Sequence, residues 1–267
     1  MHWEELSWPK LDDLDRKLPV VVPLGSCEQH GPHMPLFVDT IQVAEIARCV
    51  ETELREEMLL VPTLWLGSSH HHRDFPGTIS LLPTEYVRVV QAVAKSVLRA
   101  GFRRVFFLNG HGGNVAPATT ALVDLIAECD EADDAYLALS SWWRVAADEL
   151  RPDKIGITQP VISHACAYET SLMLALRPEL VDLEKLPPRP APALHDDWFH
   201  SEDDSRQRVS VFRRFHRYTA DGALGKPHEA SLERGELILK TAVGEVVTFL
   251  REFAQWPDLP QLGPAHP

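Results

Sequence analysis

Apolar runs with the length of β-strands alternate with amphipathic helical segments along the first half of the chain. The strand-like runs lie at residues 19–24, 58–62, 104–108 and 135–139, and the helical segments between them at 40–57, 83–100 and 117–129. The helical segments carry apolar residues at the period of an α-helix, whereas the strand-like runs are short and apolar. This order predicts an α/β fold, with a mostly parallel sheet covered by helices on both faces.

The second half of the chain has a weaker pattern. Residues 164–176 and 229–253 are predicted to be helical, and residues 186–207, rich in Pro and Asp, are predicted to form an irregular loop. Neither an internal repeat nor a hinge linker is present, so residues 1–267 are predicted to form one domain.

Residues that commonly bind metals follow three of the predicted strands. Glu28 and His30 follow the first strand, the histidines 70–72 follow the second, and His111 follows the third. Because the carboxyl ends of parallel strands meet at one edge of a sheet, these side chains are expected to lie close together. Clustered imidazoles and carboxylates predict a metal site at that edge.

Composition excludes several other classes of function. The formal net charge is −13, which disfavours binding to nucleic acid and to anionic membranes. No apolar run approaches the roughly 20 residues of a membrane span, and the N-terminus lacks a signal-peptide pattern, so a cytoplasmic location is expected. The four cysteines show no metal-binding or disulfide spacing and are expected to be reduced.

Four polar segments carry the candidate chemistry. Glu28 and His30 are two residues apart, which places both side chains on one side of an extended loop. Asp39 opens the next helix, where it is either a ligand or a helix-capping acid. His111 lies in a glycine-rich loop; such loops also cradle phosphate, but the spacing here matches no phosphate-binding motif. A metal ligand fits that histidine better.

The third segment holds His164 and Glu169. Glu169 heads an apolar helical run, so its charge must be paired or bind something; the alternative is a capping Glu beside a surface histidine. The three consecutive histidines 70–72 cannot all face one metal, and one or two of them are expected to line the pocket. Cys27 beside Glu28 is a candidate nucleophile, but it is equally well explained as a small core residue.

These segments together resemble the creatininase family, the creatinine amidohydrolases and their relatives. The similar pieces are residues 23–33, 39–40, 75–81, 109–114, 164–171 and 222–235. The resemblance implies a three-layer α/β fold with two divalent metal ions per subunit, zinc or manganese, with iron as a further possibility. It also implies that Asp39 bridges the ions, Glu28 and His111 complete one site, His30 belongs to the other, and His164 is catalytic. Relatives form hexamers, so a homo-oligomer is expected.

Two positions depart from the creatininase pattern. Where creatininase has a metal-binding Glu, this chain has Gly113, and we expect Glu169 to replace that ligand. Where creatininase has a tryptophan over the substrate ring, this chain has Pro160, although Trp142 matches another pocket tryptophan. Creatinine itself is therefore not expected to be the substrate.

The predicted activity is hydrolysis of a non-peptide C–N bond, an amide or cyclic amide, by a metal-activated water. His164 is expected to shuttle the proton to the leaving nitrogen, because imidazole titrates near neutral pH. His72, Trp142, Trp143 and the segment 195–217 are expected to contact a small-molecule substrate. The alternatives are opening of an inosose-type cyclic ketone, trimming of a peptide as in mycofactocin maturation, and a non-catalytic metal-binding role.

Overall fold

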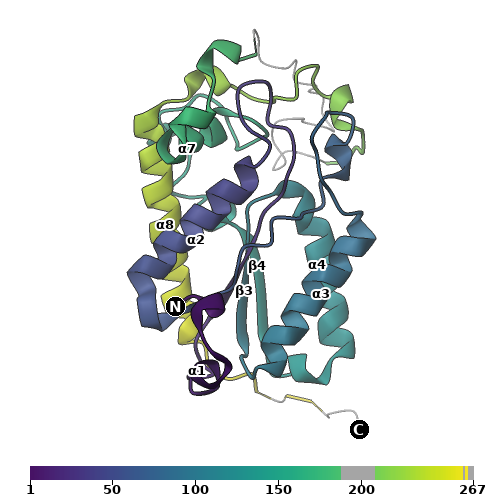
Figure 1. The fold of residues 1–267 in the computed structure, drawn as a ribbon, viewed down its shortest axis with the longest axis vertical. Helices are drawn as coiled ribbons and strands as arrows, with labels where there is room; N and C mark the ends of the chain where they lie inside the picture. Colours follow the sequence, from purple (N-terminus) through teal and green to yellow (C-terminus); the bar gives the residue numbers. More distant parts are fainter. Residues whose placement is uncertain (188–207, 261, 264–267) are drawn as a thin grey trace.

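Four parallel strands form the central sheet of the computed structural model, which describes residues 1–187, 208–260 and 262–263 (Figure 1). The strands are β1 (Val20–Leu24), β2 (Leu59–Leu60), β3 (Arg104–Asn109) and β4 (Tyr136–Ser141), in the spatial order β2-β1-β3-β4. In the register, Leu24 pairs with Asn109 and Asn109 pairs with Ser141, so three strands end at one level. The parallel sheet expected from the strand–helix alternation is confirmed.

Alternate strand residues point into two separate cores. Val21, Phe106 and Leu108 belong to the core beneath α2 (Val38–Leu54), α7 (Ala167–Leu176) and α8 (Leu232–Ala254). Val20 and Val105 belong to the core beneath α3 (Pro83–Arg99) and α4 (Val115–Glu128). Because both faces of the sheet are covered, the strands are apolar at nearly every position instead of alternating.

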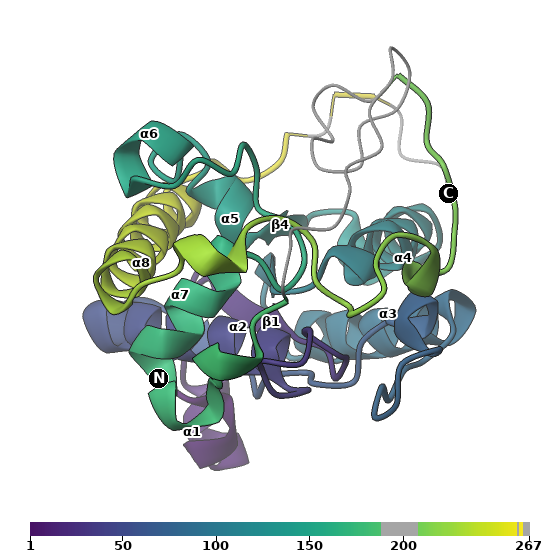
Figure 2. The same cartoon turned by 90° about the horizontal axis from the view of Figure 1, so that it is seen from above.

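The helices form the outer two of three layers. In Figure 1, α2 and α8 lie on one side of the strands and α3 and α4 on the other; Figure 2 shows the same layers from above. This arrangement confirms the expected three-layer α/β architecture. In the part of the chain that the structure describes, no helix is both long enough and apolar enough to cross a membrane.

Most predicted boundaries agree with the structure within about three residues, and the differences are local. The second strand is reduced to Leu59–Leu60, and the helix predicted from residue 164 begins at Ala167, which leaves His164 in the preceding loop. The short helices α1 (Trp8–Asp12), α5 (Trp142–Val145) and α6 (Pro152–Ile155) were not predicted, because four or five residues are too few to show a period. Most of the predicted loop at 186–207 lies outside the described residues.

The upper edge of the sheet gathers the segments that follow the strands. Strand β1 leads into the loop with Glu28 and His30, β3 leads into the loop with His111, and β4 leads directly into α5. The first turns of α2 and α7 lie at the same edge, because Asp39 and Glu169, which belong to these turns, both approach His30. Strand-end segments and the first turns of two helices therefore meet at one place.

Candidate metal centre and active site

Six of the predicted site residues meet at this edge. Glu28, His30 and His111 come from the strand-end loops, Asp39 from the first turn of α2, Glu169 from the first turn of α7, and His164 from the loop before α7. Glu28 and His30 are fully buried, and Asp39 is only 3% exposed. Buried carboxylates are stable only when they are paired or bind a cation.

Asp39 lies between two imidazoles. Its Oδ1 is 3.1 Å from His30 Nε2, and its Oδ2 is 3.0 Å from His111 Nδ1. One carboxylate thus presents a different oxygen to each of two histidines that belong to different loops. This is the arrangement expected of a group that bridges two ions. The residue that caps α2 is Phe37, so Asp39 is not the N-cap.

Three groups of ligand-type atoms lie at this site; Glu28, His30 and His164 form one of them, which shares a member with each of the other two. The first group consists of Glu28, His71 and His111, whose ligand atoms lie within 4.8 Å of one another. The second group consists of His30, Asp39 and Glu169, whose ligand atoms satisfy the same limit. Asp39 joins the groups through its contact with His111.

The surroundings of His30 require a proton or a metal ion in the second group. His30 Nδ1 lies 3.2 Å from the Glu28 backbone oxygen, which can only accept, so this nitrogen carries the proton of the neutral ring. The lone pair of Nε2 then faces Asp39 Oδ1 at 3.1 Å and Glu169 Oε1 at 3.9 Å. Three electron-rich atoms pointing at one another require a proton or a metal ion between them.

The carboxylates of Glu28, Asp39 and Glu169 also require a positively charged partner. Glu28 Oε1 and Asp39 Oδ2 are buried and accept no hydrogen bond from the described part of the chain. The charged partners of Glu28, Asp39 and Glu169 there are imidazoles, not Lys or Arg side chains. Oxygen and imidazole nitrogen donors of this kind suit divalent ions such as zinc and manganese. The residues present therefore fit a pair of metal ions.

The pKa values report the same crowding of charge. Burial alone would lower the pKa of His30, but the carboxylates of Asp39, Glu169 and Glu28 outweigh it and raise that pKa to about 10. Burial raises the pKa of Glu28 and of Glu169 to about 7, against the effect of nearby imidazoles. For Asp39 burial acts in the same direction, but His30 and His111 prevail and hold its pKa well below the usual range. Each shift reflects a cluster that binds positive charge strongly.

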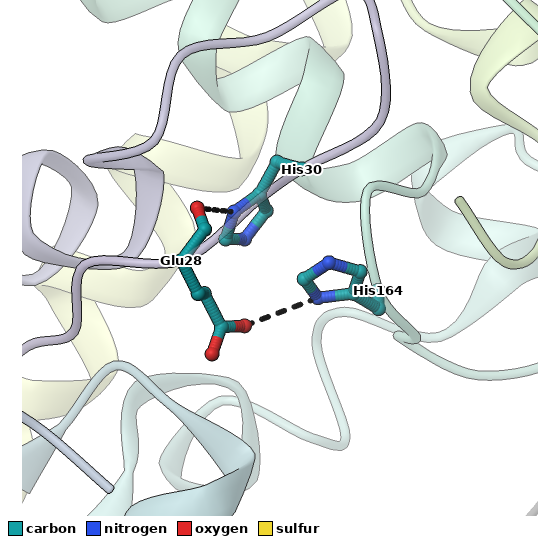
Figure 3. Close-up of side chains that lie close together, drawn as sticks. All are labelled: Glu28, His30 and His164. Carbon is teal, nitrogen blue, oxygen red and sulfur yellow. Dashed lines mark hydrogen bonds and ion pairs between the residues drawn. The ribbon is translucent and has the colours of Figure 1, made fainter. Parts of the chain in front are cut away.

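His164 lies beside the cluster and faces Glu28. Its Nδ1 is 3.4 Å from Glu28 Oε1, and its ring centroid is 4.3 Å from that of His30 (Figure 3). Its Nε2 is 2.6 Å from the Gln29 backbone oxygen, so Nε2 carries the proton and Nδ1 is left as an acceptor. Ala165 next to it adopts a left-handed backbone with φ 51°, a strained conformation that turns the chain from His164 into α7.

Glu169 has two roles, one through each oxygen. Oε2 accepts a hydrogen bond from the backbone N–H of Cys166 at 3.4 Å, which caps α7, while Oε1 faces His30. The capping alternative for Glu169 therefore describes one oxygen of the carboxylate, and the ligand hypothesis concerns the other. Both can hold at once.

The other residues predicted to belong to the site have different surroundings in the structure. His72 is buried, with Nε2 3.3 Å from Glu28 Oε1. Trp143 lines a cavity of about 730 Å³ that also reaches His164, whereas Trp142 is 1% exposed and packs in the core beneath α8. Cys27 is buried, and burial raises the pKa of its thiol, which disfavours a nucleophilic role.

Gly113 has no room for a side chain. A Cβ there would overlap the Ser68 backbone oxygen and the His111 ring, and would lie 2.7 Å from Cε1 of His71. The chain thus approaches His111 so closely that only glycine fits at this position. The place of the missing acid is filled by the His111 and His71 rings.

Gln29 and Phe215 contribute to the site without having been singled out from the sequence, and His71 had been marked only as one of the histidines 70–72. His71 stacks on His111 with ring centroids 5.7 Å apart, and Phe215 packs on His72 at 4.0 Å. The Gln29 side-chain amide lies 2.9 Å from His72 Nδ1 and donates to the Gly222 backbone oxygen at 3.0 Å. The position of Gln29 between Glu28 and His30 was the available signal for it. Nothing in the sequence pattern marked Phe215 individually.

Comparison with known proteins identifies the family of this chain. Residues 4–250 match the protein-family model described as creatininase, creatinine amidohydrolase. The chain belongs to the creatininase family. The resemblance inferred from the sequence motifs is therefore confirmed, and so is the expectation of an enzyme, an amidohydrolase that depends on metal.

Curated relatives within the family have different named activities. The creatinine amidohydrolase of Pseudomonas putida is 30% identical over 245 residues, covering 87% of this chain and 88% of the relative. The mycofactocin precursor peptide peptidase of Mycobacterium tuberculosis is 32% identical over 252 residues, covering 90% and 86%. Similar identity to two different activities means that membership of the family does not select a substrate.

Solved structures support the fold and the metal chemistry. A creatininase variant complexed with creatine superposes with a TM-score of 0.78 at 27% identity, covering 95% of this chain and 98% of that one. Other creatininase structures, at 27% and 29% identity, are described as a Zn–Zn type and as a manganese form. The candidate metal ligands of this chain therefore lie in a fold shared with solved zinc and manganese forms of creatininase.

Proposed function

We propose that this chain hydrolyses a non-peptide C–N bond, in an amide or cyclic amide, at a centre that holds two divalent metal ions. The observation that carries the proposal is the Asp39 carboxylate, whose two oxygens lie 3.1 Å from His30 Nε2 and 3.0 Å from His111 Nδ1. A pair of divalent cations would neutralise this carboxylate together with Glu28 and Glu169, which face the same imidazoles.

The proposed ligands divide into two sets that share Asp39. Glu28, Asp39 and His111 would hold one ion, and His30, Asp39 and Glu169 would hold the other. When bound, such ions lower the pKa of a coordinated water and polarise the substrate carbonyl. The sequence position of Gly113 supports Glu169 as the acid of the second set, because no side chain fits at 113.

The remaining side chains position groups and move protons. The lone pair of His164 Nδ1 points toward Glu28, at the edge of the cavity, where it can accept a proton from water and return it to a leaving nitrogen. Gln29 donates to His72 Nδ1, so His72 Nε2 carries its proton and faces Glu28 Oε1 at 3.3 Å. We therefore assign His72 to the positioning of Glu28 rather than to substrate contact.

Substitution of His164 tests the proton-transfer role. We expect His164→Ala to lower turnover of an amide substrate by about 10²-fold or more, with an unchanged content of metal. The substrate is found by offering the metal-loaded enzyme a panel of linear and cyclic amides that includes creatinine. A protein that hydrolyses none of them while binding metal normally would contradict the proposal.

Creatinine is not the substrate that we propose. The cavity wall near His164 carries Pro160 and the metal centre carries Gly113, two differences from creatininase that change the pocket and the ligand set. Peptide trimming is the second candidate, because the mycobacterial peptidase is as similar to this chain as creatinine amidohydrolase is. Ring opening of a cyclic ketone rests on the 3-dehydro-scyllo-inosose hydrolase of Thermotoga maritima, 29% identical over 169 residues.

A further inference from the structure

The cavity beside His164 has an unusual distribution of charge. Its volume is about 730 Å³, the size of a small-molecule site, and its wall runs from His164 and Ser163 to Trp143, Arg144 and Arg151. The chain holds 39 acidic residues against 26 basic ones, yet no Asp or Glu lines this cavity within the described residues. Its two formally charged residues are both arginines.

The two arginines are not equivalent. The Arg151 guanidinium lies 3.4 Å from the Asp153 carboxylate, which neutralises part of its charge. The Arg144 guanidinium forms neither a hydrogen bond nor an ion pair with the described part of the chain. A guanidinium offers a planar pair of donors that matches the two oxygens of a carboxylate. Arg144 is therefore the group in this wall that is free to bind an anion.

The fold holds Arg144 at a fixed place relative to the metal centre. Strand β4 ends at Ser141, and α5 begins at Trp142, so Arg144 follows the strand end by three residues. The Asn109 side-chain amide donates to Ser141 Oγ at 2.9 Å and to the His111 backbone oxygen at 2.7 Å, which ties the strand end to the loop of His111. Trp143 packs edge-on against the buried Trp142, with centroids 5.3 Å apart, and forms a firm wall next to Arg144.

We propose that Arg144 forms a subsite for a carboxylate on the substrate, so that the enzyme prefers amides that carry a free carboxylate near the bond to be cleaved. This inference rests on the function proposed above. Three carboxylates, Glu28, Asp39 and Glu169, would bind two divalent ions, so the loaded centre would have a surplus of positive charge and would not repel an anionic substrate. Trp143 supplies a flat apolar surface for the remainder of the molecule.

Binding of two matched probes tests the subsite directly. N-benzoylglycine carries the carboxylate, and N-benzoylglycinamide replaces it with a neutral amide of the same shape. We expect metal-loaded protein in a His164→Ala background, which suppresses turnover, to bind the acid about tenfold more tightly in calorimetry. Adding Arg144→Gln should abolish the preference. Arg177→Gln is the matched control, because that guanidinium pairs with Glu179 on the exposed surface outside the cavity.

Kinetics separate a failure of the subsite from a failure of the proposed function. With His164 intact, Arg144→Gln should raise KM for a carboxylate-bearing amide about tenfold, with little change in kcat and in KM for the neutral analogue. If Arg144→Gln left the preference for the acid unchanged while amides were hydrolysed, the subsite would be refuted and the hydrolase would stand. If no amide were hydrolysed but Arg144 still governed binding of the acid, the subsite would stand and the hydrolase would not.

Discussion

The two groups of metal-ligand residues are assembled in different ways. Glu28 and His111, of the first group, follow two neighbouring strands, and the Gly110 backbone N–H donates to the Leu24 backbone oxygen at 2.8 Å, just before the loops diverge. His30 and Glu169, of the second group, come from segments 139 residues apart and meet only because α7 packs at the sheet edge. The first group is therefore built by the sheet, and the second by helix packing.

The contacts that support the two groups of ligand residues differ in the same way. Behind His111, Ser69 Oγ lies 3.2 Å from Nε2 and the Asn109 amide donates to the backbone oxygen at 2.7 Å. Glu169 is held by the Cys166 backbone N–H at 3.4 Å and by the Gln42 side-chain amide, which donates to the Glu169 backbone oxygen at 2.9 Å. We expect the first group to retain its ion more firmly than the second, because more of its ligand geometry is fixed before metal binds.

Removing the shared carboxylate should have the largest effect. We expect Asp39→Ala to abolish retention of both ions and to lower turnover by about 10²-fold or more, since each set loses a ligand. Metal content after gel filtration, measured by mass spectrometry, reports the first effect. Asp124→Ala, an exposed acid on α4, is the control. An Asp39→Ala protein that retained two ions would show that Asp39 bridges nothing.

Substituting one acid of each group should affect the binding of one metal ion at a time. We expect Glu169→Gln to leave about one ion per chain and Glu28→Gln to destabilise the other, because each change removes a charge from one set only. Titration with a chelator while the metal content is followed distinguishes the two variants. Loss of both ions in Glu169→Gln would mean that the two groups act as one unit, contrary to the comparison.

The same contrast explains which parts of the fold and of the site the sequence alone predicts. The strands were predictable because a sheet buried on both faces requires continuous apolar runs, and the strand-end rule then brings Glu28 to His111. The start of α7 at Ala167 and the φ of 51° at Ala165 depend on tertiary packing, so the placement of His164 outside the helix was not predictable. Adjacent identical residues could not be distinguished from the sequence either, because nothing local shows that Trp143 and not Trp142 reaches the cavity.

His71 sharpens the comparison, because it belongs to the first group although the sequence marked it only as one of the histidines 70–72. Its ligand atom lies within 4.8 Å of those of Glu28 and His111. We expect His71→Ala to weaken retention of one ion by about tenfold, the smaller end of the effect of losing a supporting residue at a metal site. Unchanged metal affinity with lost turnover would instead assign His71 to proton transfer.

Cysteine substitution shows directly whether position 71 contacts the metal. His71→Cys loaded with Co²⁺ should acquire a thiolate-to-cobalt charge-transfer band in the near ultraviolet that the parent protein lacks. His70→Cys, in the same short turn, is the matched control, because His70 is not among the ligand-type groups of the described chain. The same band in both variants would mean that the turn binds cobalt without selectivity for position 71.

The smallest expected effect is on stability, and it concerns the contact between His33 and Thr170 that supports the second group. His33 Nε2 and Thr170 Oγ1 are hydrogen bonded at 2.9 Å, which joins the loop of His30 to the helix of Glu169. Burial, with a further contribution from His30, lowers the pKa of His33 to about 4. An unfolded histidine titrates near 6.5, so between pH 6.5 and 4 the unfolded chain binds the extra proton. Protonation of His33 therefore favours unfolding as the pH falls through this window.

Urea unfolding of the metal-free protein measures this contribution. Between pH 6.5 and 4 the free energy of unfolding of the parent should fall by up to about 1.4 kcal/mol per pH unit more steeply than that of His33→Gln. The difference between the two proteins isolates His33, because His30 and His111, whose pKa values are raised to about 10 and about 9, titrate alike in both. If the free energies of unfolding of the two proteins changed with pH in parallel, His33 would take up its proton in the folded state without loss of stability. The contact between His33 and Thr170 would then not be needed to keep Glu169 close to His30.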